Sequence, residues 1–185
     1  MRYDLPESVV LNGETYRINA DFRAALDILE ILNDPELSGR ERISLALLYF
    51  YPEFPRMSPA CWQQAVEECF RFLAGDEEPR PGPVLMDWQQ DFPYIIAPVN
   101  RVVGREVRGE AFFHWWSFLG AYREMGQCLF TQMVAIRSKR AKGQKLDPAE
   151  ERWYRENRAL VDLKPRFSRG EEELMKTWGR KAAEH

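Results

Sequence analysis

The segment FFHWWSFLGAY, residues 112–122, constrains the fold more than any other part of the chain. On a helical wheel started at its first residue, the apolar side chains cover well over half of the circumference. A helix of this kind contacts neighbours on several sides, so we expect it to be central to the fold. His114 falls on the narrow polar strip, away from the aromatic face. The predicted core residues are Phe112, Trp115, Trp116 and Leu119.

Most of the remaining periodicity is helical and begins at recognisable caps. Asp21 precedes an apolar repeat with helical spacing, and Ser38 and Glu41 have the spacing of a capping box. The repeat after Asp21 consists of Phe22, Leu26, Leu29 and Leu32. Local helix signals of this strength predict that most of the chain is helical.

A single β signal lies near the N-terminus. Asn12-Gly13 separates two short apolar runs, and this pair favours a two-residue hairpin turn because it tolerates positive φ. We therefore predict a mainly α fold: a single-domain bundle of about seven or eight helices with a short N-terminal β-hairpin.

Two further helices can be placed by their prolines. Ser58-Pro59 is expected to start one, since proline suits the first helical turn. Its predicted apolar stripe is Ala65, Val66, Cys69, Phe70 and Leu73. The other is expected over residues 91–103, with Asp91 as N-cap and Pro93 in the first turn.

The chain divides into one domain and an extension. Residues 74–86 are rich in proline, glycine and acids and are predicted to be an internal loop of a domain spanning residues 1–163. Residues 164–185 are predicted to be a C-terminal helical extension, capped by Ser168 and Glu171, whose polar end frays.

The charge and cysteine content exclude several classes of protein. The formal net charge is only −3, whereas general nucleic-acid or anionic-membrane binders lean basic. We find no signal-peptide core and no run of about 18 apolar residues, so a soluble, cytoplasmic protein without membrane contact is expected. Cys61, Cys69 and Cys128 do not have metal-site spacing and are expected to be free thiols.

A catalytic centre has weak support. His114 could act with Asp87 or Asp91 in a hydrolase or transferase, since a general base needs an acid or nucleophile within reach. However, there is no nucleophile elbow, no zinc-binding histidine pair and no phosphate-binding glycine motif, and the only other histidine is His185. The favoured interpretation is that Asp91 caps a helix and that the protein holds no metal or cofactor and is not an enzyme.

The run RSKRAKGQK, residues 137–145, carries five cations. It could neutralise phosphates in a small nucleic-acid-binding regulator, but it lacks an aromatic residue for base stacking. The alternatives are a solvated connection between helices, which is favoured, and a contact with a protein partner. The residues that would serve a partner are Arg137, Lys139 and Arg140.

Several segments together resemble one family of small phage proteins. They are INADFRAALDILEIL, DWQQDFPYIIAPVNRVVG, FHWWSFLGAY and IRSKRAKGQKLDPAEERWYRENRALVDL, in that order along the chain. The chain is similar to the "gene-product fifteen" family of tailed phages and prophages from about Leu5 to Leu163. It departs from the family at REVRGEA, where relatives tend to have an Ile-Asp-Leu type segment.

The resemblance implies a non-enzymatic tail-assembly chaperone in the cytoplasm of the bacterial host. The implied partner is the tape-measure protein, with the tail-tube protein or a companion chaperone as further partners, and self-association is compatible with such a role. Spaced apolar residues on terminal helices would provide the contacts, since recognition of a helix in a groove uses such anchors. The candidate contacts are Trp153, Tyr154, Leu174 and Trp178.

Overall fold

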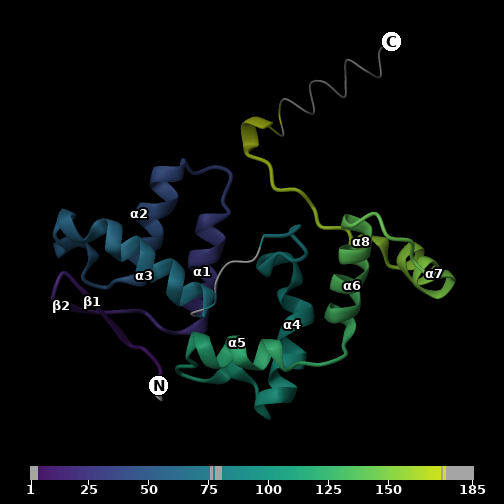
Figure 1. Ribbon diagram of the computed structural model, residues 1–185, viewed down its shortest axis with the longest axis horizontal. Coiled ribbons are helices and arrows are strands. Elements are labelled where there is room, and N and C mark those ends of the chain that lie inside the picture. The colour runs from purple at the N-terminus through teal and green to yellow at the C-terminus, as the bar shows by residue number, and fades with distance from the viewer. Residues whose placement is uncertain (1–3, 76, 78–80, 172, 174–185) are drawn as a thin grey trace.

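The computed structural model describes residues 4–75, 77, 81–171 and 173. Within these residues the fold is mainly α, with α-helices α1 to α8, the first residues of a further helix at 169–171, three short 3-10 helices and one two-stranded sheet (Figure 1). The helices are α1 (Phe22–Leu32), α2 (Gly39–Phe50), α3 (Trp62–Ala74), α4 (Trp88–Val103), α5 (Trp115–Arg123), α6 (Leu129–Ala141), α7 (Pro148–Glu156) and α8 (Arg158–Val161). The 3-10 helices are Phe54–Arg56, Pro59–Cys61 and Val107–Gly109. None of the helices in the described ranges is long and apolar enough to cross a membrane.

The predicted N-terminal hairpin is confirmed. Strands β1 (Ser8–Leu11) and β2 (Glu14–Arg17) pair antiparallel, and the turn residues Asn12 and Gly13 have φ of 48° and 87°. Both values lie in the left-handed region that this type of turn requires. The Asn12 backbone N–H donates to Gln64 Oε1 at 3.0 Å, which fastens the turn to α3.

The main core lies where α5 meets α1, α3 and α4. The Trp115 ring stacks on Phe118, which stacks on Phe22 of α1 with ring centroids 4.9 Å apart. Each indole N–H of the tryptophan pair donates to a carbonyl near the end of α3, Trp115 to Leu73 and Trp116 to Phe72. These contacts make α5 the central helix of the main core, although it is shorter than the aromatic segment.

The prediction that Phe112 belongs to the core is wrong, and so is the placement of His114 on a polar strip. Residues 112–114 precede the helix in an extended conformation and pair with the start of α1, where the Phe22 backbone N–H donates to Phe113 O. The wheel assumed a helix from Phe112, whereas α5 begins at Trp115. Phe112 is 49% exposed, and His114 is buried as the N-cap of α5.

Two helix starts also differ from prediction. Helix α4 is capped by Asp87 rather than Asp91, so Pro93 lies beyond the first turn. The Ser58-Pro59 pair starts a 3-10 helix, and the α-helix α3 follows it from Trp62. Along α3, Phe72 is buried in the place expected for Phe70, which is 45% exposed. The local sequence allows either cap and either phenylalanine, and packing decides between them.

A second, smaller core lies at the other end of the molecule, where α6, α7 and α8 meet (Figure 1). It consists of Met133, Ile136, Tyr154 and Val161. Helix α6 joins the two cores, because its first turn contributes Phe130 to the main one. The predicted connection at residues 137–145 is therefore helical as far as Ala141.

Candidate functional site

His114 is held by the backbone through both ring nitrogens. Nδ1 accepts from the Trp116 backbone N–H at 3.0 Å, and Nε2 lies 3.0 Å from Pro6 O. A carbonyl oxygen can only accept, so Nε2 carries the proton and the tautomer is set by these two contacts. His114 therefore acts as a helix cap that fastens the N-terminal strand region to α5.

Neither acid considered as a partner for His114 is hydrogen-bonded to it. Asp91 pairs with Arg137, and Asp87 pairs with Arg166. The catalytic grouping considered from sequence is thus not assembled in the described part of the chain. That part also brings together no group of three metal-ligating side chains.

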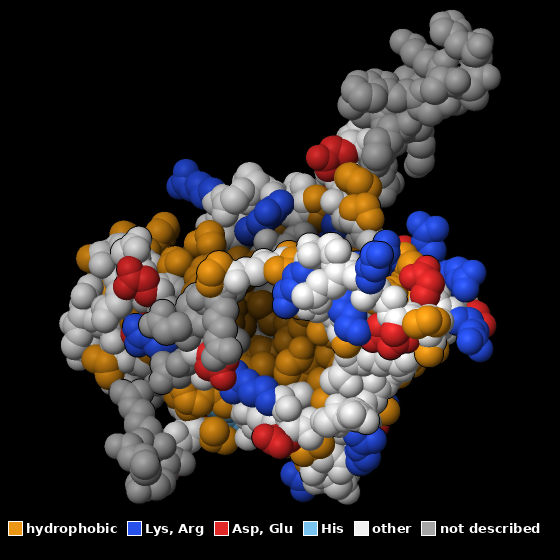
Figure 2. Space-filling model, turned by 45° about the vertical axis from the view of Figure 1, so that its right-hand side comes forward, with side chains coloured by type: hydrophobic (Ala, Val, Ile, Leu, Met, Phe, Trp, Pro, Cys, Tyr) orange, Lys and Arg blue, Asp and Glu red, His pale blue; other side chains and the backbone are white. Residues whose placement is uncertain are grey.

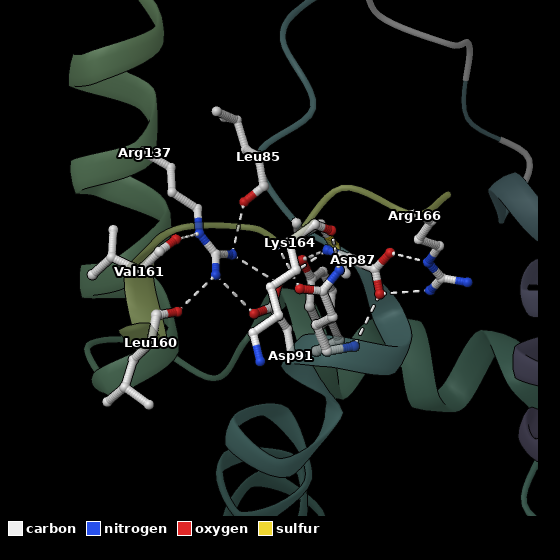
Figure 3. A network of polar contacts seen from close by, with 11 residues as sticks. Leu85, Asp87, Asp91, Arg137, Leu160, Val161, Lys164 and Arg166 are labelled. Carbon is white, nitrogen blue, oxygen red and sulfur yellow. Dashed lines mark hydrogen bonds and ion pairs between the residues drawn. The ribbon is translucent and has the colours of Figure 1, made fainter. Parts of the chain in front are cut away.

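Arg137 and Asp91 instead form a buried ion pair between α6 and α4 (Figure 3). The side chains are 7% and 1% exposed, and the two N–H···O distances are 2.7 and 2.9 Å. The three remaining guanidinium protons go to main-chain carbonyls of Leu85, Leu160 and Val161. All five donors of the arginine are satisfied, which is the condition for a buried charge to be tolerated.

A second set of polar contacts holds the segment that follows α8 against the start of α4 (Figure 3). Gln90 of α4 makes two hydrogen bonds to the backbone of Lys164, both at 2.9 Å. Arg166 forms a bidentate ion pair with Asp87, the N-cap of α4, at 2.7 and 3.0 Å. Burial alone would raise the pKa of Asp87, but Arg166 and the Gln90 backbone N–H outweigh it, so the pKa of this carboxyl lies below its usual range.

The basic run does not form an open cationic surface. Arg137 is buried, so it is not available to a partner. Lys139 pairs with Glu150, and Arg140 pairs with Asp162 while lying over the Tyr154 ring. Within the run, Lys142 and Lys145 are the cations that remain exposed without a described ion pair. The acids that neutralise the run come from α4, from α7 and from the C-cap of α8, and the prediction of a solvated connection did not include these contacts.

The candidate apolar contacts on the terminal helices are only partly exposed. Tyr154 is buried in the smaller core, and its hydroxyl donates to Asp162, so the prediction of an exposed Tyr154 is wrong. Trp153 packs against the same core and is half-buried. Leu174 and Trp178 lie outside the described residues.

A more substantial apolar surface is a groove between α1, α3, α4 and α5. Its larger part has a volume of 480 Å³, and its floor is formed by Trp115 and Leu119 of α5. Its walls include Leu29, Leu32, Phe70, Leu73 and Trp88. Glu77 is also part of the lining, and Figure 2 shows a hollow with an apolar floor beside the neighbouring grey atoms. We call this feature the α1 groove.

The α1 groove continues along α1 on the other side of Trp88. This smaller part has a volume of 220 Å³ and is bordered by Leu26, Phe92 and Arg166. Its outer rim carries Asp27 and Glu30, both exposed. The two parts share Leu29 and Trp88, so they lie next to each other along α1.

The groove exists because α1 has more apolar surface than the core covers. Phe22, Ala25 and Ile28 are fully buried, whereas Leu26, Leu29 and Leu32 are half-buried and face the groove. The sequence repeat was used only to predict a helix. The six residues fall within one apolar arc of about 160° on a helical wheel, and an arc wider than a single buried stripe is the signal that could have indicated the groove.

Comparison with known proteins gives a family but no close relative. No match is found among curated proteins, and none among solved structures. The family model described as "Bacteriophage Gp15 protein" matches residues 1–163, which include helices α1 to α8 and all lining residues of the α1 groove except Arg166. The chain therefore belongs to the bacteriophage Gp15 protein family.

Proposed function

We propose that this phage protein is a tail-assembly chaperone that binds an apolar helical segment of the tape-measure protein in the α1 groove and carries out no catalysis. The observation that supports this most directly is the groove itself. It is a concave surface lined mostly by apolar side chains, and clefts of this kind are common binding sites. Family membership supports a phage role, and the family resemblance supports the tape-measure protein as client.

The shape of the groove suits the apolar face of a helix. Helix-in-groove recognition places side chains spaced by three and four residues into a hydrophobic channel. The α1 groove runs along one helix and is walled by residues from three others, so it offers such a channel. Tape-measure proteins are long and aggregation-prone, as the resemblance implies, so covering an apolar face would keep the client soluble before the tail tube closes around it.

The remaining surfaces leave room for further partners. The tail-tube protein, a companion chaperone or a second copy could contact faces away from the groove, for instance around the exposed Val102 of α4. We place the protein in the cytoplasm of the bacterial host, where the client is synthesised. None of these partners requires a cofactor.

Co-expression with the tape-measure protein tests the proposal. We expect the wild-type chain to co-purify with its client and to raise the soluble fraction of that client. Phe70→Lys should abolish both effects, because it puts a charge at an apolar wall of the groove. Phe70 is 45% exposed, so the substitution should leave the fold intact, as circular dichroism would verify.

Tyr49→Lys is the matched control, since Tyr49 is 47% exposed and is not part of the groove lining. It should retain wild-type binding. If the wild-type chain neither binds the tape-measure protein nor improves its solubility, the proposed function is wrong. If both substitutions reduce binding equally, the client contacts a surface other than the groove.

A further inference from the structure

After α8, the described chain runs to the rim of the α1 groove. Gln90 and Asp87 hold Lys164 and Arg166 at the start of α4, and Arg166 itself borders the smaller part of the groove. Three residues later, the Arg169 backbone N–H donates to Glu36, which follows α1. The chain thus runs from the start of α4 to the segment that follows α1.

A new helix begins at this point. Ser168 and Glu171 form a reciprocal capping box, with Ser168 N–H donating to Glu171 Oε2 at 2.8 Å and Glu171 N–H donating to Ser168 Oγ at 3.3 Å. Gly170 lies inside the box and is helical, and a Cβ there would meet no neighbouring atom. Residues 172–185, of which only 173 is described, follow directly from the groove rim.

The sequence of that segment is suited to an apolar channel. Leu174, Met175 and Trp178 have the spacing of one helical face. Lys176, Arg180 and Lys181 accompany them, and no acid occurs between residues 174 and 183. The segment therefore carries bulky apolar anchors flanked by three positive charges.

The part of the rim that α1 forms has the opposite charge, whereas the two arginines of the lining, Arg71 and Arg166, pair with Glu68 and Asp87. Asp27 and Glu30 lie on the outer face of α1, with Asp34 and Glu36 just beyond its end. Asp27 makes no ion pair to another described residue, and burial raises the pKa of its carboxyl. A cation placed beside it would favour the charged form and offset that cost. Charge and apolar pattern thus match between the rim and the segment.

We propose that the C-terminal segment, residues 172–185, docks in the α1 groove of its own chain and competes there with the client. Trp178 and Leu174 are the anchors, and Lys176, Arg180 or Lys181 faces Asp27 and Glu30. Reach is not a constraint: Trp178 is nine residues beyond Arg169, and a helix advances about 1.5 Å per residue, or roughly 14 Å in all. The competition rests on the proposed function, whereas the docking does not.

Photo-cross-linking in the full-length chain tests the docking without any client. Trp178 is replaced with p-benzoylphenylalanine, the protein is irradiated at low concentration, and cross-linked peptides are mapped. We expect a product of monomer mass that joins position 178 to peptides of α1 or α3. Phe70→Lys should remove this product, and Tyr49→Lys should retain it.

Other products would overturn the proposal. A product of dimer mass would show that the segment enters the groove of a second copy, and cross-links to elements that do not line the groove would show that it docks elsewhere. Loss of all defined products would show that it does not dock. Each outcome is independent of whether the tape-measure protein is the client.

The affinity for the client tests the competition between the C-terminal segment and the client separately. A chain with Leu174→Ala and Trp178→Ala should bind the client about tenfold more tightly, if the segment fills the groove for about nine-tenths of the time in the wild type. Unchanged affinity, with the intramolecular cross-link present, would refute competition and leave docking intact. Failure of any client binding, with the cross-link present, would refute only the proposed function.

Discussion

Arg137 is the residue on which most of the long-range order at one end of the molecule depends. Its guanidinium contacts α4, the segment before α4 and the end of α8, and it is itself on α6. A buried charge held in this way is stabilised only while every partner stays in place, because an unpaired ion in a low-dielectric interior is costly. Any single substitution in this cluster should therefore lower the free energy of unfolding.

Asp91→Asn should destabilise the protein by about 3–5 kcal/mol, since it leaves the buried guanidinium without its counter-charge. Chemical denaturation measures the difference. The control is Glu106→Gln, which alters an exposed ion pair to Arg108 and should change stability far less. Replacing both partners, Asp91→Leu with Arg137→Met, should cost less than Asp91→Asn alone. Equal effects of Asp91→Asn and Glu106→Gln would contradict the stabilising role assigned to the pair.

Asp87 predicts a pH dependence with a defined sign. The pKa of its carboxyl is lowered in the folded protein, so the stability it contributes is present above the unfolded value, about 3.9, and is lost as the pH falls further. Thermal denaturation of the wild type and Asp87→Asn between pH 7 and pH 3 tests this, because asparagine keeps the capping ability without the titration. We expect the wild type to be more stable at neutral pH and the difference to shrink below about pH 4. A difference that stays constant with pH would argue against the Arg166 contact.

At the scale of the element, helix caps were predictable from sequence and helix partners were not. The caps at Asp21, Ser38 and Ser168 depend on residues within three positions of each other, so local chemistry determines them. Asp91 could also serve as a local cap, and its actual partner is 46 positions away. No local pattern specifies that pairing.

The predicted start of helix α5 was wrong for a different reason. The composition of residues 112–122 correctly indicates a helix with neighbours on several sides, but the wheel depends on where the helix begins. Because His114 can accept a hydrogen bond from Trp116, the helix begins three residues later than assumed. That change turns Phe112 from a predicted core residue into an exposed one.

Gly75, which ends α3, should tolerate no side chain. Its φ is +71°, and a Cβ would lie 2.9 Å from Leu119 Cδ1, an atom of the groove floor. Gly75→Ala should therefore cost more than Gly104→Ala, the equivalent substitution after α4, where φ is +80° but no atom lies within 4 Å. Both substitutions share the cost of placing a Cβ on a residue with positive φ, which is about 1–2 kcal/mol. Denaturation midpoints compare the two, and equal losses would show that the close contact relaxes freely.

At the scale of the whole molecule, two cores of unequal size share helix α6. The larger surrounds α5, and the smaller lies between α6, α7 and α8. Few apolar residues hold the smaller core, so the Arg137 cluster supplies much of its attachment to α4. Regions with few buried apolar contacts open more readily than the main core.

Native-state hydrogen exchange should show this division. The amides of α7 and α8 are expected to exchange with lower protection than those of α5. Arg137→Met should reduce protection in α7 and α8 more than in α1 and α3, because it detaches the smaller core and leaves the larger one in place. Uniform loss of protection across all helices would instead indicate a single cooperative unit.

The contacts of Gln90 with Lys164 and of Asp87 with Arg166 have a consequence for binding strength. They fix the origin of the C-terminal segment at the groove rim, so the segment is a tethered ligand with only a few residues of slack. Tethers of this length give effective concentrations of the order of millimolar. A weak intrinsic affinity is then enough to keep the groove filled, whereas a free client must overcome that concentration by binding more tightly or by offering several segments in succession.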